Sequence, residues 1–331
     1  MLAAHRLTMP IALGLLAVAL PLFAAQPGAA DPAPGFPSRP IRMIVPFAPS
    51  GPNDQLARMV GVKLTEAWGQ PVVVDNRPGA GTVIGTELAV RSPADGHTML
   101  MISLSTAVNP VLQKKLPYDT AKELAPLVNL AVSPNIFVVH PAVPANNIAA
   151  LLALAKARPG EITYASGGTG AATHLAGELL ANMGGVKMTH VPYKGANPAT
   201  LDILGGRVNC MFGTILPTLP HVKSGKLRAI GISSQKRAPT LPDVPAIAET
   251  LPGFEAVSFY GVGVPAGVPK PVMAKLNAEI ARIITAPDTR ELLRQQGADA
   301  VGNSQAEFTA FFRSEMIKWA KVIKDAGIRP E

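Results

Sequence analysis

Short apolar runs alternate with longer stretches of helical spacing along most of the chain. The runs predict strands, and apolar residues that recur at helical spacing predict amphipathic helices. The predicted strands lie at 41–47, 71–75, 98–102, 125–131, 135–140, 187–191, 208–212, 227–232 and 256–264. The predicted helices lie at 54–68, 82–91, 148–157, 171–183, 198–204, 219–224 and, with a break at 298–304, over 271–327. This alternation predicts an α/β fold of parallel sheets with helices on both faces.

The stretch 161–175 reads as a short strand, a glycine-rich turn and a helix start. Gly167, Gly168 and Gly170 allow a tight turn. The amide groups and the dipole of a helix start favour a carboxylate or phosphate. A second unit of this kind follows the strand 41–47. The pattern also fits a turn that only connects a strand to a helix, and the stretch alone does not separate the two interpretations.

Hydroxyl side chains follow the predicted strand 98–102 at Ser103, Ser105 and Thr106. Open α/β sheets place ligands at the carboxyl ends of their strands. These three residues are therefore candidates for a binding site.

The length of the chain bears on the number of domains, and its first residues indicate an exported protein. A chain of 331 residues is long enough for two domains. Residues 1–30 have the layout of a secretory signal peptide, with His5 and Arg6, then the apolar run 11–25, then small residues. That run is shorter than the ~20 residues of a membrane-spanning helix. We therefore predict that the segment is removed on export.

The charge and the aromatic content argue against a nucleic-acid partner. The net charge is +8, but the 30 basic residues are scattered along the chain and aromatic residues make up 5% of it. Neither a basic stripe nor a set of base-stacking platforms is present in the sequence. The positive charge is only weak support for an acidic ligand, because net charge mainly affects solubility and steering.

Reactive constellations are missing from the sequence. The single cysteine, Cys210, excludes an internal disulfide, and no two histidines have the spacing of a zinc-binding helix. There is no G-x-S-x-G elbow or P-loop, and a proline-containing segment separates Gly79, Gly81 and Gly85 from the preceding strand. His174 is a candidate anion donor and equally a packed or capping histidine. We predict binding rather than catalysis, with no catalytic residue, metal or cofactor.

Several short motifs occur in order between residues 37 and 328. They are R-P-I-R (39–42), V-P-F-A-P (45–49), D-N-R-P-G-A-G (75–81), A-D-G-H-T (94–98), K-L-P-Y-D (115–119), H-V-P-Y-K-G (190–195) and L-P-D-V-P (241–245). In these motifs the sequence resembles the Bug family of periplasmic solute receptors, the substrate-binding components of tripartite tricarboxylate transporters.

The resemblance implies a two-lobed periplasmic binding protein of type II, the Venus-flytrap architecture, in which the chain crosses twice between the lobes. Lobe 1 would comprise 38–138 and 257–331, and lobe 2 would comprise 139–256. The implied function is that of a monomeric periplasmic receptor. It would capture a small carboxylate in the interlobe cleft and deliver it to the membrane subunits of a tripartite tricarboxylate-type transporter.

The resemblance also implies which residues bind the ligand. In the first lobe they are Phe47, Ala48, Ser50, Gly51, Asn53, Ser103, Ser105 and Thr106. In the second lobe they are Ser166, Thr169, Gly170, Ala171, His174, Lys194, Gly195 and Gly213.

Two departures from the family pattern bear on the ligand. Ser50 and Pro52 stiffen the first loop, and Pro52 removes an amide donor. Gly213 stands where the family often has aspartate, which favours a plain mono- or dicarboxylate, with room for an aromatic one, over an amino acid. Two alternatives stay open, namely an α/β enzyme that acts on an acidic substrate and a solute receptor used for signalling.

Overall fold

The structure, a computed structural model, describes residues 31–193, 196–328 and 330. The predicted signal peptide (1–30) and two of the predicted ligand contacts, Lys194 and Gly195, lie outside the described residues.

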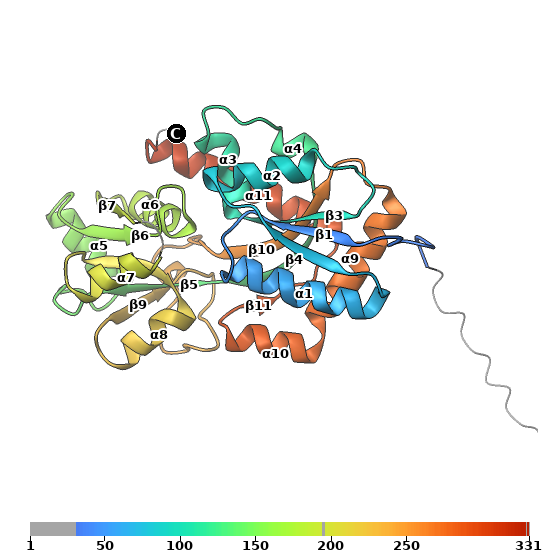
Figure 1. Cartoon of the computed structure of the whole chain (residues 1–331). Coiled ribbons are helices and arrows are strands. Elements are labelled where there is room, and N and C mark those ends of the chain that lie inside the picture. The colour runs from blue at the N-terminus through green and yellow to red at the C-terminus, as the bar shows by residue number, and fades with distance from the viewer. Residues whose placement is uncertain (1–30, 194–195, 329, 331) are drawn as a thin grey trace, which may run out of the picture. The chain divides into compact units, whose positions relative to one another are not determined.

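The described strands form two sheets (Figure 1). The first has the order β11-β4-β10-β3-β1-β2. Its strands are β1 (Ile41–Val45), β2 (Val72–Asn76), β3 (Thr98–Ser103), β4 (Leu124–Ser133), β10 (Ser258–Pro265) and β11 (Asp299–Ala300). The second has the order β7-β6-β8-β5-β9. Its strands are β5 (Asn135–Val139), β6 (Thr163–Ser166), β7 (Thr189–Pro192), β8 (Cys210–Thr214) and β9 (Arg228–Ile232).

Helices connect the strands of each sheet. Those associated with the first sheet are α1 (Pro52–Trp68), the 3₁₀ turn η1 (Ala80–Thr82), α2 (Val83–Val90), α3 (Leu104–Leu112), α4 (Thr120–Glu123), α9 (Lys270–Thr285), α10 (Pro287–Gln295) and α11 (Gln305–Asp325). Those associated with the second sheet are α5 (Ile148–Ala157), α6 (Ala172–Gly184), α7 (Ala196–Leu204), α8 (Ile215–Lys223) and the 3₁₀ turn η2 (Ile247–Glu249).

Helices cover both faces of each sheet, and successive residues of a strand pack against helices on opposite faces. In β1, Met43 packs in a cluster with residues of α1 and α9, whereas its neighbour Ile44 packs in another with residues of α2 and α11. In β5, Ile136 packs with residues of α7 and α8, and Phe137 with residues of α5 and α6. Successive side chains of a strand point to opposite faces, so apolar residues at consecutive positions require cover on both sides.

The prediction of parallel sheets is correct for some strand pairs and wrong for others, because both sheets are mixed. β1 is parallel to β2 and β3, but β10 is antiparallel to β3 and β4. In the second sheet, β5 is antiparallel to β8 and β9. β5 and β10 are the strands by which the chain enters one sheet from the other. They are not reached by the helical crossover within one sheet that makes neighbouring strands parallel.

The helix α3 was not predicted, because Asn109 and Pro110 are residue types that favour a turn. Pro110 lies inside the helix, where it removes one backbone donor. The apolar face outweighs that loss, since Leu104, Val108 and Leu112 are all buried. The short elements α4 and β11 were also not predicted.

The two passages between the sheets are tied to each other. The chain leaves β4 at Ser133 and enters β5 at Asn135, and it returns just before β10. The backbone N–H of Asn135 donates to Ser233 Oγ at 2.7 Å, and its side-chain Nδ2 donates to the Ala256 carbonyl at 3.1 Å. A lobe boundary placed where the chain passes from the first sheet to the second would lie at Pro134, whereas the sequence predicted it at 138. The division into lobes stays a proposal.

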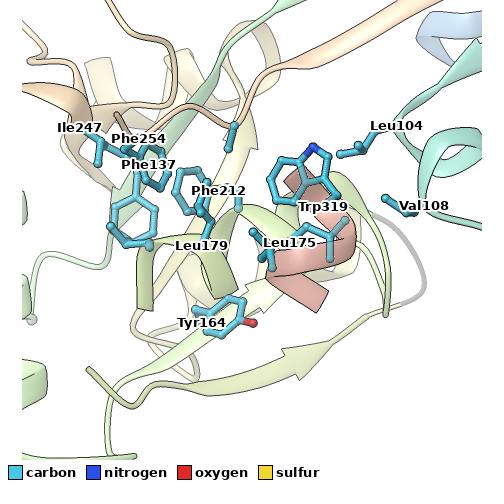
Figure 2. Close-up of a cluster of buried hydrophobic side chains, with 14 of the residues drawn as sticks. Leu104, Val108, Phe137, Tyr164, Leu175, Leu179, Phe212, Ile247, Phe254 and Trp319 are labelled. Atoms are coloured by element: carbon cyan, nitrogen blue, oxygen red, sulfur yellow. The ribbon is translucent and has the colours of Figure 1, made fainter. Parts of the chain in front are cut away.

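The last long helix, α11, contributes to packing on both sheets. It contacts α3 beside the first sheet and α6 beside the second. Its Trp319 is completely buried in a cluster that also contains Leu104 of α3 and Leu175 of α6 (Figure 2). The indole Nε1–H donates to Glu315 Oε2 at 2.7 Å, so the one polar atom of the ring is satisfied.

Candidate functional site

A cavity of about 490 Å³ lies between segments associated with the two sheets. One side is formed by η1 and α3, and the other by the glycine turn between β6 and α6. The lining residues are Ala80, Gly81, Ser105, Val108, Asn109, Leu112, Gln113, Gly167, Gly168, Thr169, Gly170 and Ala171. None of these carries a charge, so the cavity is lined by small, apolar and neutral polar groups.

The glycine turn has a backbone that only glycine adopts readily. Gly168 has φ 134° and Gly170 has φ 74°, both in the left-handed half of conformational space. The turn is held from within, because the Gly167 amide donates to Thr173 Oγ1 at 3.1 Å and the Ala171 amide to the Gly168 carbonyl at 3.1 Å. No side chain caps the start of α6. The first amides of that helix therefore remain available to a ligand.

The opposite side of the cavity has an unusual left-handed backbone. The values of φ are 133° at Gly79, 45° at Ala80, 60° at Gly81 and 85° at Thr82. A β-branched residue rarely adopts such a value. The side chain of Asn109 compensates by donating from Nδ2 to Thr82 Oγ1 at 3.0 Å. Strained backbone of this kind concentrates at ligand sites.

Two lining side chains, Asn109 and Gln113, were not identified from the sequence. A Cβ on Gly81 would lie 3.6 Å from both Asn109 Oδ1 and Gln113 Nε2, so both amide groups face the η1 turn. They are four residues apart and would share one face of a helix. That signal was present but depended on predicting α3.

The structure brings four of the predicted contacts to the cavity, namely Ser105, Thr169, Gly170 and Ala171. Their neighbours Ser103 and Thr106 are buried, and the Ser103 amide donates to Thr106 Oγ1 at 3.4 Å as part of the cap of α3. The predicted first-lobe loop residues do not line this cavity. They are Phe47, Ala48, Ser50, Gly51 and Asn53. Their contact with a ligand stays a prediction.

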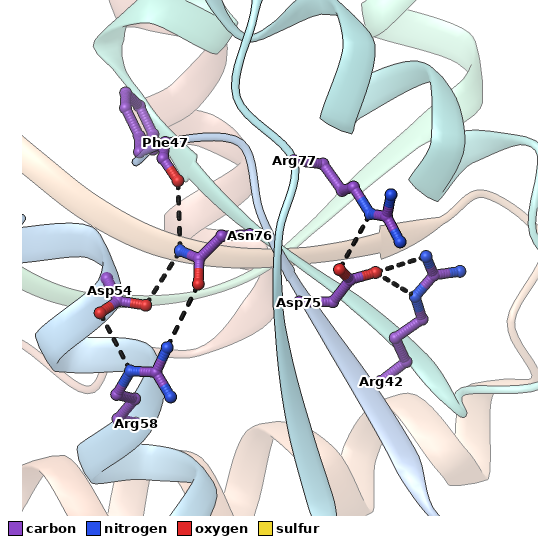
Figure 3. A network of polar contacts seen from close by, with 7 residues as sticks. All are labelled: Arg42, Phe47, Asp54, Arg58, Asp75, Asn76 and Arg77. Carbon is purple, nitrogen blue, oxygen red and sulfur yellow. Dashed lines mark hydrogen bonds and ion pairs between the residues drawn. The ribbon is translucent and has the colours of Figure 1, made fainter. Parts of the chain in front are cut away.

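That first-lobe loop is fixed by Asp54, which is buried (Figure 3). Its carboxylate accepts hydrogen bonds from Arg58 Nε at 3.0 Å, the Ser50 amide at 2.9 Å and Asn76 Nδ2 at 2.9 Å. Asn76 Nδ2 also donates to the Phe47 carbonyl at 3.1 Å. The bond from Arg58, with those from Ser50 and Asn76, lowers the pKa of Asp54 to about 2 against the opposing effect of burial.

We expect Asp54→Asn to lower the melting temperature at pH 7, because it unpairs a buried network. The free energy of unfolding should fall by about 1–3 kcal/mol. The native pKa lies below the ordinary value of about 3.9, so this stabilisation is present above about pH 4 and is lost as the pH falls towards 2. The difference between the variant and the wild type should therefore shrink over that window in thermal melts.

The matched control is Glu291→Gln. The bond from Arg294 also lowers the pKa of Glu291 to about 2, but the side chain is 49% exposed compared with 4% for Asp54. Exposed pairs contribute little. Equal effects of the two substitutions at pH 7 would contradict the role given to Asp54.

Ser166 and His174, two further predicted contacts, lie behind the turn rather than in the cavity. They are 1% and 3% exposed. Ser166 Oγ is 2.6 Å from Nε2 of His190, and His174 Nδ1 accepts the Gly170 amide at 3.0 Å. His174 is thus the packed histidine that the sequence left as an alternative, and it bonds to the turn before the helix. Glu178, four residues after His174, was overlooked although that helical spacing places it beside the histidine.

Gly213 lies on β8, paired with Ile136 of β5. A Cβ at this position would be 2.5 Å from Thr218 Oγ1, so the side chain of Thr218 occupies the space beside the glycine. Gly213 does not line the cavity. Its effect on ligand choice stays a prediction.

The described residues include no group of three or more His, Cys, Asp or Glu side chains that could hold a metal ion. Cys210 is fully buried, and burial raises the pKa of its thiol well above the usual range. Within the described part of the chain, no helix has both the length and the apolar character needed to cross a membrane.

The structure has two mixed sheets covered by helices, and the chain passes twice between them. A cavity is bordered from both sides. This is the architecture of a two-lobed α/β periplasmic binding protein of the Venus-flytrap type. The sequence model of the tripartite tricarboxylate transporter family receptor matches residues 56–328. The chain belongs to this family, whose members are periplasmic solute-binding receptors. The resemblance to Bug proteins is confirmed by BugT of Bordetella pertussis, which is 38% identical over 95% of this chain and 98% of its own length.

Two solved structures are similar over nearly the whole described chain. The adipate complex of Rpa4515 from R. palustris has a TM-score of 0.78 and 33% identity, and covers 89% of this chain and 100% of its own. MatC from Rhodopseudomonas palustris with bound malate has a TM-score of 0.74 and 29% identity, and covers 87% of this chain and 100% of its own.

Proposed function

We propose that this protein captures a small mono- or dicarboxylate in the cavity between its two sheets and presents it to a tripartite tricarboxylate-type transporter. The observation that carries the proposal is the composition of the cavity. Its lining has no charged side chain, and it includes the uncapped start of α6 and a hydroxyl, Ser105, in the first turn of α3. Helix starts and neutral donors stabilise an anion.

The size and polarity of the cavity fit this ligand class. About 490 Å³ lies within the usual range of roughly 300–1,000 Å³ for small-molecule sites. Thr169 and Gln113 provide additional hydrogen-bonding groups, and the absence of a lining carboxylate avoids repulsion of an anion. Adipate and malate, bound by two similar proteins, belong to the same class.

The family and the sequence together support a wider role. We propose that residues 1–30 direct export to the periplasm, that the mature protein is a monomer with lobes divided as predicted, and that it hands its ligand to membrane subunits. No catalysis, metal or cofactor is needed for this role. The sixteen predicted contacts remain candidates, with Ser105, Thr169, Gly170 and Ala171 best supported by the cavity.

The test combines native mass spectrometry of freshly purified protein with calorimetric titration of malate, adipate, succinate and benzoate. We expect a retained anion or saturable binding of at least one carboxylate. The diamine 1,4-diaminobutane, a cation of similar length to succinate, is the control and should not bind. Binding of the diamine alone, or of none of these anions, would refute the proposal. Conversion of a carboxylate into product would favour the enzyme alternative.

A further inference from the structure

A compact polar cluster lies directly behind the glycine turn. The rings of His174 on α6 and His190 on β7 are stacked, with centroids 3.8 Å apart and planes 12° from parallel. Tyr164 of β6 stacks on His190 at 5.0 Å and donates its hydroxyl hydrogen to Glu178. Ser166, at the end of β6, completes the cluster through its contact with His190.

Each histidine is linked to an amide of the turn. The Gly170 N–H donates to Nδ1 of His174 at 3.0 Å. The Gly168 N–H donates to Ser166 Oγ at 3.1 Å, and Ser166 Oγ is 2.6 Å from Nε2 of His190. The two linked glycines are the residues of the turn with left-handed backbone, φ 134° and 74°. The cluster therefore holds the two least ordinary conformations of the turn.

One hydrogen bond fixes the tautomer of His174. A backbone N–H can donate only to a ring nitrogen without a proton, so Nδ1 of His174 is bare and Nε2 carries the hydrogen. Nε2 lies 3.7 Å from Glu178 Oε1, on the side where that hydrogen is favoured. Ser166 Oγ accepts from the Gly168 amide, and its own hydrogen can go either to Nε2 of His190 or to the Gly168 carbonyl at 3.1 Å, so these bonds do not assign the tautomer of His190.

We propose that His174 and His190 are positioning residues, which hold the turn 167–171 in its ligand-receiving conformation and do not contact the ligand. This inference rests on the proposed function, because it takes the turn to be one wall of the carboxylate site. His174 acts directly on Gly170, and His190 acts on Gly168 through Ser166. The carboxylate would meet the start of α6 only when both links are made.

Ionisable groups from three elements surround the histidine pair. The groups that face the pair are Glu178 from α6, Tyr164 from β6 and, beside Tyr164, the Cys210 thiol from β8. Burial, together with the neighbouring His174, lowers the pKa of His190 to about 4, so His190 stays neutral near pH 7.

The first test needs no ligand. Amide hydrogen exchange of ¹⁵N-glycine-labelled protein reports Gly168 and Gly170 separately. In ¹⁵N-histidine-labelled protein, the ring ¹⁵N shifts report which ring nitrogens carry a proton. His174→Phe keeps a stacked ring but removes the acceptor, and we expect Gly170 to exchange about tenfold faster or more. His174→Asn places a side-chain oxygen near the former Nδ1, so protection should return.

His190 offers an independent pair of variants. His190→Phe should release Gly168 and leave Gly170 protected, whereas His190→Gln keeps a polar group for Ser166 and should protect both. Unchanged Gly170 protection in His174→Phe, or a protonated Nδ1 on His174 at pH 7, would overturn the proposal.

The second test separates this inference from the proposed function. The same variants are titrated with the carboxylate that binds the wild type best, in the series malate, adipate, succinate and benzoate. We expect about tenfold weaker binding by His174→Phe, with recovery in His174→Asn. A released turn with unaltered affinity would show that the histidines position the turn but that the turn is not the carboxylate site. A rigid turn with no binding of any of the four anions would refute the proposed function alone.

Discussion

Replacement of Gly85 by alanine is expected to lower the stability of the protein. Gly85 is buried in α2. An added Cβ would lie 2.8 Å from the carbonyl oxygen of Arg77 and 2.8 Å from Cβ of Pro46. Contacts this short require the helix or the two loops to move, because backbone and proline atoms cannot turn aside. Overpacking of this kind costs about 1–3 kcal/mol.

The control for Gly85→Ala is Gly61→Ala in α1. Gly61 is also buried inside a helix, but its nearest neighbour to an added Cβ would be Val72 Cγ1 at 3.3 Å, a side-chain atom. Alanine gains about 1 kcal/mol over glycine in helix propensity, which should offset the mild crowding. Chemical denaturation should therefore show a lower midpoint for Gly85→Ala and little change for Gly61→Ala. Similar midpoints for the two variants would contradict the close packing of α2.

The glycines at 79, 81 and 85 show why one sequence pattern supports different interpretations. Their spacing suggests a dinucleotide-binding turn, but a proline-containing segment separates them from the preceding strand. In the structure, Gly79 and Gly81 have left-handed backbone and Gly85 allows a helix to touch two loops. Both reasons are geometric, and the sequence shows neither. It indicates only that glycine is present.

Much of the fold could be predicted because most strands carry their own apolar signal. Strands such as β3 and β5 are buried on both faces and contain continuous apolar runs. The direction of β5 and β10 could not be predicted, since it depends on which sheet the chain arrives from. The helix α3 was missed because Pro110 is a strong local signal against a helix that tertiary packing overrides.

The site was harder to predict than the fold, because hydroxyl groups of neighbouring residues look equivalent in a sequence. Ser103 and Thr106 bond to each other at the start of α3, and only Ser105 between them lines the cavity. The helix start decides which hydroxyl is free. Likewise, the role of His174 depended on the direction of its ring, which the position in the chain does not determine.

Gly170→Val is expected to weaken carboxylate binding about a hundredfold. Gly170 has φ 74°, and an added Cβ would lie 2.6 Å from Cδ1 of Leu112, which lines the opposite side of the cavity. Valine therefore strains the turn and also pushes against α3 across the ligand space. Overpacking and misplacement of the turn together should cost about 3 kcal/mol of binding free energy. Calorimetry with the carboxylate that binds the wild type measures the change.

The cavity effect is separated from backbone strain by Gly185→Val at the other end of the same helix. Gly185 has φ 60°, and nothing lies within 4 Å of an added Cβ, so valine there has a similar backbone cost without the contact. We expect Gly185→Val to lower the melting temperature but to keep the wild-type affinity. Adding Leu112→Ala to Gly170→Val should recover part of the lost binding, because it removes the atom that valine meets. Equal affinities for Gly170→Val and the wild type would mean that the turn does not border the ligand. The cavity would then not be the carboxylate site of the proposed function.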